Sequence, residues 1–149
     1  MLDDLTNLQA LLKDSTLLAT RGYVAGEWCD GETGQTFPVY NPARGDVITD
    51  VADISRNQTA EAISIAEKAQ KLWAARPAKE RSNLLRNWYN LMMENQEDLA
   101  TILTAEQGKP IEEAKGEIAY GASFIEFFAE EAKRVYGETI PGHQEDKRI

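Results

Sequence analysis

The chain carries few side chains that could act as nucleophiles or metal ligands. It has one cysteine, Cys29, and one histidine, His143. A single cysteine excludes an internal disulfide and a cysteine-rich metal site, and a single histidine excludes a histidine-based zinc cluster within one chain. Cys29 lies in GEWCDGETG, beside a predicted tight turn, where no base or helix N-terminus is apparent to activate its thiol. We therefore interpret Cys29 as structural, and His143 as part of the polar stretch PGHQEDK.

Phosphate-binding and acid–base motifs are also missing from the sequence. No two glycines are separated by one residue, so the G-x-G-x-x-G fingerprint is absent, and the Gly-Lys pair at 108–109 is followed by proline, which excludes a P-loop. Carboxylate pairs at 112–113 and 130–131 are neighbours in sequence, and such neighbours do not share a helix face. We interpret them as parts of solvated faces.

Composition narrows the possible partners. The 149 residues include 16 Lys+Arg and 25 Asp+Glu, giving a net charge of −9, and 42% are hydrophobic. This length suits one domain or a piece of a larger one. An acidic surface repels phosphate backbones and anionic lipid, so we expect neither nucleic acid nor membrane as a partner. The first residues include Asp3 and Asp4, where a secretory signal needs positive charge, and we expect a cytoplasmic protein.

The first half of the sequence reads as a short helix followed by strands. Leucines spaced by three and four residues, at positions 2, 5, 8 and 12, form one apolar stripe. The runs 23–28 and 36–41 flank a turn rich in glycine and aspartate, which predicts a β-hairpin over about 23–41. Pro38 restricts the second run to an edge strand, and residues 47–51 form another predicted strand.

The second half reads as helices. From Asn57 the apolar spacing becomes three to four residues, which predicts helices over about 57–136. Asn57 is the predicted cap of the first helix, and Pro77 ends it and begins the second. Asn95 predicts a break before a separate helix over 96–107. The predicted buried stripes are Ala62, Ala66, Ala69 and Trp73, then Leu84, Trp88, Leu91 and Met92.

The last predicted helix contains two glycines. Residues 108–110 form a stop signal, and the helix is expected to run over 111–136 and to end at Gly137. Gly116 and Gly121 each cost about 1 kcal/mol against alanine inside a helix. They predict close approach by another element, which the chain does not obviously provide. Taken alone, this order of elements predicts an α+β domain with a mostly helical second half.

Four segments, in this order, carry a resemblance to a known family. They are VAGEW…TFPVYNPARGDVI, AEKAQKLWAARPAKERSNLLRNWYNLMMENQEDLA, EQGKPIEEAKGEI and FAEEAKRVYGETIP. Together they resemble the N-terminal part of the aldehyde dehydrogenase superfamily, from about Tyr23 to Ile149. EQGKP with A-x-G-E-I is the most specific pair. The stretch from EQGKP to GETIPGHQ is most similar to the bacterial succinate-semialdehyde dehydrogenases.

The resemblance implies an α/β fold. This chain would be its N-terminal part, a small β-hairpin plus helices that cover a Rossmann-like sheet largely absent from the chain. Residues 1–137 would belong to the cofactor-binding domain, and residues 138–149 would begin a truncated oligomerisation arm. That sheet would be the close neighbour of Gly116 and Gly121. By family, the enzyme would be a homodimer or homotetramer.

The resemblance also implies an NAD- or NADP-dependent oxidation of a small aldehyde, succinate semialdehyde, to its acid. In the family a cysteine thiolate forms a thiohemiacetal, hydride leaves to the nicotinamide, and a glutamate-activated water releases the acid. These groups and the cofactor-binding motifs are expected beyond Ile149. We therefore assign no catalytic or cofactor-binding residue here and expect the chain alone to be inactive. The alternative is a catalytically inactive truncated product or remnant that acts only through subunit contacts; a third, an acidic interaction module, does not explain EQGKP.

Two sites within the chain follow from the resemblance. A structural monovalent cation, Na⁺ or K⁺, would be held by the backbone carbonyls of Val39 and Tyr40 and by the side chain of Glu106. Alternatively, Glu106 simply caps or pairs at the end of its helix. Tyr120 and Phe124 would line the tunnel that admits the aldehyde. Alternatively, they are core residues, because aromatic residues at helical spacing often are.

Overall fold

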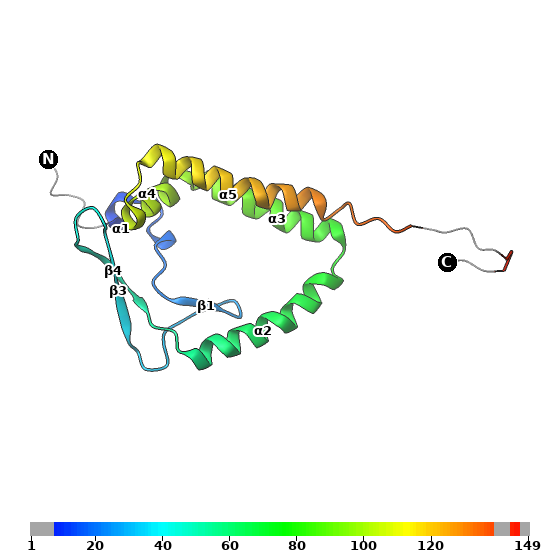
Figure 1. Ribbon diagram of the computed structural model, residues 1–149, viewed down its shortest axis with the longest axis horizontal. Helices are drawn as coiled ribbons and strands as arrows, with labels where there is room; N and C mark the ends of the chain where they lie inside the picture. The colour runs from blue at the N-terminus through cyan, green and yellow to red at the C-terminus, as the bar shows by residue number, and fades with distance from the viewer. Residues whose placement is uncertain (1–7, 139–143, 147–149) are drawn as a thin grey trace.

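The computed structural model describes residues 8–138 and 144–146, and Figure 1 shows two small hairpins followed by a series of helices. His143, Leu2 and Leu5 lie outside the described residues. The strands are β1 (Gly22–Val24), β2 (Glu27–Cys29), β3 (Thr36–Tyr40) and β4 (Val47–Ala52). The helices are α1 (Leu8–Leu11), the 3₁₀ turn η1 (Ser15–Leu17), α2 (Arg56–Ala75), α3 (Ala78–Glu94), α4 (Gln96–Gln107) and α5 (Ile111–Glu131). None of the described helices is long and apolar enough to cross a membrane.

The prediction of one hairpin over residues 23–41 is wrong, because the two predicted strands do not pair with each other. The first half of the segment forms a hairpin by itself, and the second half pairs with the strand that follows it. Tyr23 of β1 lies opposite Trp28 of β2 across a turn at Ala25 and Gly26, whose φ angles are 55° and 89°. Positive φ at both central positions is typical of a type I′ turn, whose twist suits a tight hairpin. β3 pairs antiparallel with β4 instead. Each sheet has two strands, so Pro38 does lie in an edge strand.

The cap of α2 is Ser55, not the predicted Asn57. Ser55 Oγ accepts a hydrogen bond from the Gln58 N–H at 3.1 Å, and Gln58 Oε1 accepts one from the Ser55 N–H at 3.0 Å. This reciprocal pair is a capping box, for which the sequence S-x-x-Q carries the signal. The Gln58 side chain also binds the backbone of Asp30 and Glu32, which fixes the start of α2 against the preceding loop.

The predicted breaks between the later helices are confirmed. Asn95 ends α3 and begins α4, and α4 spans the predicted residues 96–107. Gly108 ends α4 in the left-handed conformation, with φ of 79°. Glycine adopts this conformation without the steric penalty of a Cβ. Pro110 then precedes α5, where its missing N–H is harmless.

The end of α5 is earlier than predicted, at Glu131 instead of Tyr136. The N–H groups of Lys133 and Arg134 bind the carbonyls three residues before them, at 3.2 and 2.9 Å. Bonds of this type tighten the last turn of a helix and close it. Gly137 is therefore not the residue that ends the helix.

α3 and α5 lie side by side and pack through small residues (Figure 1). Ala114, Ala122 and Ala129 of α5 are fully buried, and Ser82 of α3 is 4% exposed. Small side chains allow two helix backbones to approach closely. A Cβ placed on Gly116 or Gly121 would meet no atom within 4 Å. The close neighbour expected for these two glycines is therefore not among the described residues.

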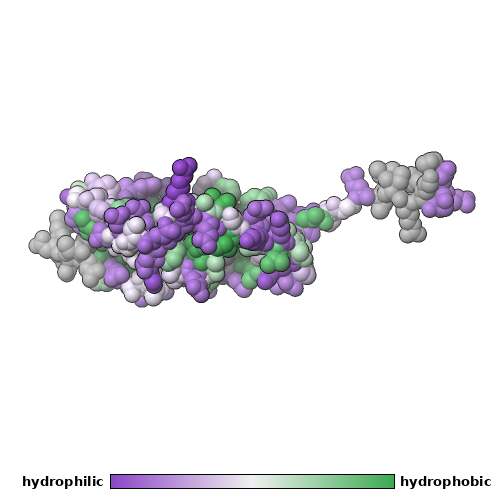
Figure 2. Space-filling view, turned by 90° about the horizontal axis from the view of Figure 1, so that it is seen from below, coloured by the Kyte–Doolittle hydropathy of each residue, from purple (hydrophilic) through white to green (hydrophobic). Residues whose placement is uncertain are grey.

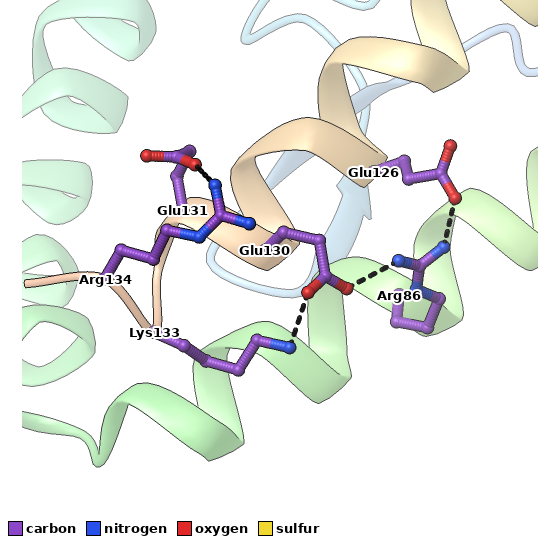
Figure 3. A network of polar contacts seen from close by, with 6 residues as sticks. All are labelled: Arg86, Glu126, Glu130, Glu131, Lys133 and Arg134. Atoms are coloured by element: carbon purple, nitrogen blue, oxygen red, sulfur yellow. Dashed lines mark hydrogen bonds and ion pairs between the residues drawn. The ribbon is translucent and has the colours of Figure 1, made fainter.

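A charged cluster also joins α3 to α5 (Figure 3). Arg86 of α3 donates to Glu126 at 2.5 Å and to Glu130 at 2.8 Å, and Lys133 donates to Glu130 at 2.7 Å. Hydrogen bonds from Lys133 and Arg86 lower the pKa of Glu130 below its ordinary value of 4.5. The cluster links the C-terminal half of α5 to the middle of α3.

The N-terminal part of the chain supplies the hydrophobic core cluster of the described residues. Leu8, Leu12 and Leu18 pack together against Ile48, Ile102 and Ala105. The buried carboxylate of Asp98 accepts the N–H groups of Lys13 at 3.0 Å and Asp14 at 2.8 Å. These contacts attach the segment before β1 to both α4 and β4.

Large apolar side chains remain exposed on three helices. The predicted burial of the α2 and α3 stripes is wrong for this chain: no residue of α2 is buried, and Trp88 of α3 is 54% exposed. α3 instead turns Ser82 and Arg86 toward α5. Hydrophobic residues also gather in the middle of the face shown in Figure 2. The exposed large apolar residues of these helices include Ile63, Leu72, Leu84, Trp88, Leu91, Tyr120, Phe124, Phe127 and Phe128.

The Glu130 cluster predicts a specific pH dependence. Because the folded pKa of Glu130 is lowered, its contribution to stability is present above about pH 4.5 and is lost as the pH falls through the folded pKa. We expect the thermal midpoint of Glu130→Gln to fall less than that of the parent between about pH 7 and about pH 3. Glu113→Gln, an exposed carboxylate on the same helix, serves as the control. Equal pH dependence in Glu130→Gln and the parent would contradict this.

The exposed apolar faces predict binding of a hydrophobic dye. We expect the purified chain to enhance the fluorescence of anilinonaphthalene sulfonate under native conditions. Trp88→Gln with Leu91→Gln should reduce this signal by about half or more while changing stability by about 0.5 kcal/mol or less, because both side chains are exposed. A folded chain that binds no dye would show that these faces are covered.

Candidate functional site

The turn between α4 and α5 is fixed by the two most specific sequence motifs. The N–H of Gly108 donates to the carbonyl of Thr104 at 2.9 Å, which closes α4. Lys109, from EQGKP, forms an ion pair with Glu117, from A-x-G-E-I. Lys115 binds Glu97 of α4 at 2.9 Å and thereby joins the two helices. The ion pairs formed by residues of the two motifs therefore stabilise this turn.

The turn between β3 and β4 is organised by Asn41, which is 9% exposed. Its Oδ1 accepts the N–H groups of Ala43 and Arg44 at 2.9 and 3.2 Å, and its N–H donates to the carbonyl of Asp46 at 2.9 Å. An Asn side chain that binds the backbone two residues ahead stabilises a turn. Arg44 and Asp46 are joined by two hydrogen bonds of 2.7 Å, and these lower the pKa of Asp46.

These two turns lie against each other. A Cβ added to Gly108 would lie 3.1 Å from Cγ of Pro42. Pro42 and Gly108 are therefore neighbours, although more than sixty positions separate them in the sequence. Along the chain, this contact is two residues from Tyr40 on one side and two residues from Glu106 on the other.

The three predicted cation ligands differ in exposure. Val39 is half-buried, whereas Tyr40 is 55% exposed and Glu106 is exposed. The register of β3 and β4 shifts between Val39 and Tyr40. Val39 pairs with Thr49 and Tyr40 with Val47, so the extra residue at this irregularity is Ile48 of β4. Within residues 8–138 and 144–146, the Glu106 carboxylate makes no ion pair, and no group of three or more His, Cys, Asp or Glu side chains is placed to hold a metal.

Tyr120 and Phe124 lie one helical turn apart on α5. Their rings meet edge to face with centroids 4.9 Å apart, and the side chains are 66% and 50% exposed. They are not core residues of the described part of the chain. Phe127 and Phe128 are also exposed and continue the same aromatic stripe, at a spacing of three to four residues. Tyr120 lies about 14 Å along the axis from the start of α5, at 1.5 Å per residue.

A pocket of about 280 Å³ adjoins the two turns. It lies between α1, the Asn41 turn, α4 and the start of α5, with Leu8 and Ile48 in its wall. Oγ1 of Thr104, which also lines it, is buried and has no hydrogen-bond partner in the part of the chain that the structure describes. Sequence inspection missed this pocket, because its walls come from segments far apart in the chain.

The remaining chemically active side chains are in ordinary surroundings. The thiol of half-buried Cys29 lies over Gly22 of the neighbouring strand. Glu112 pairs with Lys115 at 3.1 Å, and Glu131 pairs with Arg134 at 2.5 Å. Glu112, Glu130 and Glu131 are therefore members of ion pairs, and Glu113 is exposed, in line with their interpretation as solvated faces.

The sequence of this chain is similar to those of known dehydrogenases. The chain is 59% identical to a glutarate-semialdehyde dehydrogenase of Pseudomonas putida and 54% identical to an NADP⁺ succinate-semialdehyde dehydrogenase of Escherichia coli. Each match covers 93% of this chain and 29% of the relative, so the chain spans less than a third of those proteins. The matches fall on the N-terminal part of the relatives.

Solved structures of related enzymes contain the same fold over most of this chain. The fold superposes on an Escherichia coli NADP-dependent enzyme with a TM-score of 0.85 at 55% identity, covering 92% of this chain and 28% of that one. A succinate-semialdehyde dehydrogenase from Burkholderia pseudomallei gives 0.85 at 49% identity, with the same coverage. The expected fold, an N-terminal part of the aldehyde dehydrogenase fold, is thereby confirmed. Because the model of the aldehyde dehydrogenase family matches residues 28–149, this chain belongs to that family.

Proposed function

We propose that this chain is the N-terminal part of an NAD(P)-dependent aldehyde dehydrogenase that oxidises succinate semialdehyde to succinate. The observation that carries the proposal is the agreement in fold and sequence with succinate-semialdehyde dehydrogenases over nine-tenths of the chain. Relatives named for glutarate semialdehyde make the five-carbon homologue the competing substrate. Cytoplasmic location and a homodimeric or homotetrameric assembly stay predictions.

The catalytic thiol and the dinucleotide site are assigned by this proposal to the remaining length of the enzyme. A bound NAD(P) supplies the hydride acceptor for aldehyde oxidation. The residues of this chain do not fit that cofactor, because no glycine-rich phosphate motif is present and Cys29 lies in a hairpin without a neighbouring base. Their contribution is to shape and support the site.

Tyr120 and Phe124 are proposed to form an apolar wall for the incoming aldehyde. Two observations support this role: the rings are held edge to face, and they are exposed in the chain taken by itself. An aromatic pair of this kind offers a rigid surface against the methylene groups of a semialdehyde.

The carbonyls of Val39 and Tyr40 and the carboxylate of Glu106 are proposed to hold Na⁺ or K⁺. The contact between Pro42 and Gly108 and the lack of an ion pair at Glu106 among the described residues support this site. Oxygen donors suit a hard cation, which would bind the β3–β4 turn to the end of α4.

A chimera tests the function. Replacing the matching N-terminal part of the Pseudomonas putida relative with this chain should give an enzyme that reduces NAD⁺ or NADP⁺ with succinate or glutarate semialdehyde, whereas the chain alone should not. Tyr120→Ala in the chimera should lower kcat/KM for the semialdehyde about tenfold through loss of apolar contact.

Tyr23→Ala, which removes an equally exposed tyrosine from the β1–β2 hairpin, is the matched control and should change kcat/KM less than about twofold. Equal effects of the two substitutions would contradict the tunnel role. An inactive but folded chimera, with the parent relative active, would favour the alternative of a non-catalytic product that acts only through subunit contacts.

The cation site predicts ion-dependent stability of the same chimera. Its thermal midpoint should rise by about 2–4 °C when potassium or sodium chloride replaces tetramethylammonium chloride at equal ionic strength. Glu106→Gln should abolish the rise, because it removes the anionic ligand, whereas Glu113→Gln should retain it. A rise that persists in Glu106→Gln would rule out Glu106 as a ligand.

A further inference from the structure

Arg86 of α3 binds two carboxylates of α5 at once. Its Nη1 donates to Oε1 of Glu126 at 2.5 Å, and its Nη2 donates to Oε1 of Glu130 at 2.8 Å. Because these glutamates lie one helical turn apart, the two bonds, which we call the Arg86 fork, reach two levels of α5 (Figure 3). The guanidinium carbon also lies over the ring of Tyr89, 5.4 Å from its centroid. Three side chains therefore hold the plane of the guanidinium.

The apolar contact between the two helices depends less on the rotation of α5 about its own axis. The fully buried side chains of α5 are Ala114, Ala122 and Ala129, and no large side chain among the described residues is fully buried. Attraction between apolar surfaces is non-directional, so a rotation that keeps alanine methyl groups covered costs little. A forked pair of arginine and carboxylates is satisfied in a narrow range of orientations. Of the two kinds of contact, the Arg86 fork is the more sensitive to this rotation.

The aromatic rings of α5 turn with its carboxylates. At about 100° per residue, Tyr120 and Phe124 lie about 120° around the axis from Glu126 and Glu130. These rings are 66% and 50% exposed. A ring about 6 Å from the helix axis moves by about 2 Å when the helix rotates by about 20°. A gap of about 0.5–1 Å already removes a quarter to a half of the van der Waals attraction, so such a rotation would break contact with a bound molecule.

We infer that Arg86 is a positioning residue for the aldehyde, because it fixes the rotation of α5 and thereby orients the wall formed by Tyr120 and Phe124. This inference rests on the proposed function, since the wall has a task only if the enzyme admits an aldehyde. Arg86 acts through α5 and not by contact with the substrate. Its loss should therefore weaken aldehyde binding without removing a catalytic group.

Steady-state kinetics of the chimera with the Pseudomonas putida relative test this inference. Arg86→Gln should raise KM for succinate semialdehyde about fivefold and change kcat less than about twofold, because contact with the wall is lost while the reacting groups stay. Arg86→Lys should show most of the same rise, since lysine keeps the charge but cannot form the fork. A fall in kcat with unchanged KM in Arg86→Gln would show a merely structural role and would overturn the inference.

Arg134→Gln is the matched control. It removes an arginine whose ion pair with Glu131 lies at the end of α5 and does not reach α3. We expect it to change KM less than about twofold. A rise in KM equal to that of Arg86→Gln would assign the effect to lost charge and would overturn the role of the fork.

A combined variant shows whether Arg86 acts through the wall. In a chimera that carries Tyr120→Ala and Phe124→Ala, adding Arg86→Gln should change KM less than about twofold, because the wall that Arg86 orients is gone. A further rise as large as that in the parent chimera would show that Arg86 acts by another route.

A crystal structure of the Arg86→Gln chimera provides a readout that does not depend on activity. We expect the rings of Tyr120 and Phe124 to move by about 1 Å or more relative to α3, as a rotation of about 10° would produce, and to stay in place in Arg134→Gln. Unmoved rings would overturn the inference. An active chimera whose KM responds to Tyr120→Ala but not to Arg86→Gln would overturn it and leave the proposed function intact. An inactive chimera with displaced rings would contradict the proposed function and support the positioning of α5 by Arg86.

Discussion

Apolar surface in excess of what one chain can cover is the constraint on which this structure depends. α5 has two apolar faces, and the chain uses only the one formed by alanines, which packs against α3 and α4. Its aromatic face stays exposed, as does the stripe around Trp88 on α3. None of the large side chains among the described residues is fully buried. Packing between these helices therefore relies on small residues and on charged groups such as Arg86 (Figure 3).

The motifs that most clearly resemble the aldehyde dehydrogenase family have a structural explanation in this chain. Lys109 and Glu117, one from each motif, form an ion pair across the turn between α4 and α5. Gly108 provides the left-handed residue that the turn requires and leaves room for Pro42, because any Cβ there would press on the proline ring. These residues set the position of the turn, so the motif is a positioning device whose effect extends to the neighbouring Glu106.

Local signals predicted the elements well, whereas signals that depend on distant residues did not. α4 begins after Asn95 and ends before Gly108, as predicted, because capping and helix-breaking residues act within one helical turn of their own position. The hairpin over 23–41 was wrong because strands of three to five residues can pair with either neighbour, and only the turn at Ala25–Gly26 decides between them. Periodicity predicted which helix faces are apolar, but it does not say whether this chain covers them.

In the candidate site, too, local sequence signals predicted neighbours along one helix but not contacts between distant segments. Spacing marks Tyr120 and Phe124 as neighbours, because a helix brings residues four apart together. No local pattern brings Pro42 to Gly108; that contact comes from the packing of the Asn41 turn against the end of α4. The pocket at Thr104 likewise exists only after α1, β4 and α4 have packed around the N-terminal leucines. Asp98 accepts hydrogen bonds from two backbone N–H groups just after α1, so a side chain of α4 fixes the segment that supplies one wall of the pocket.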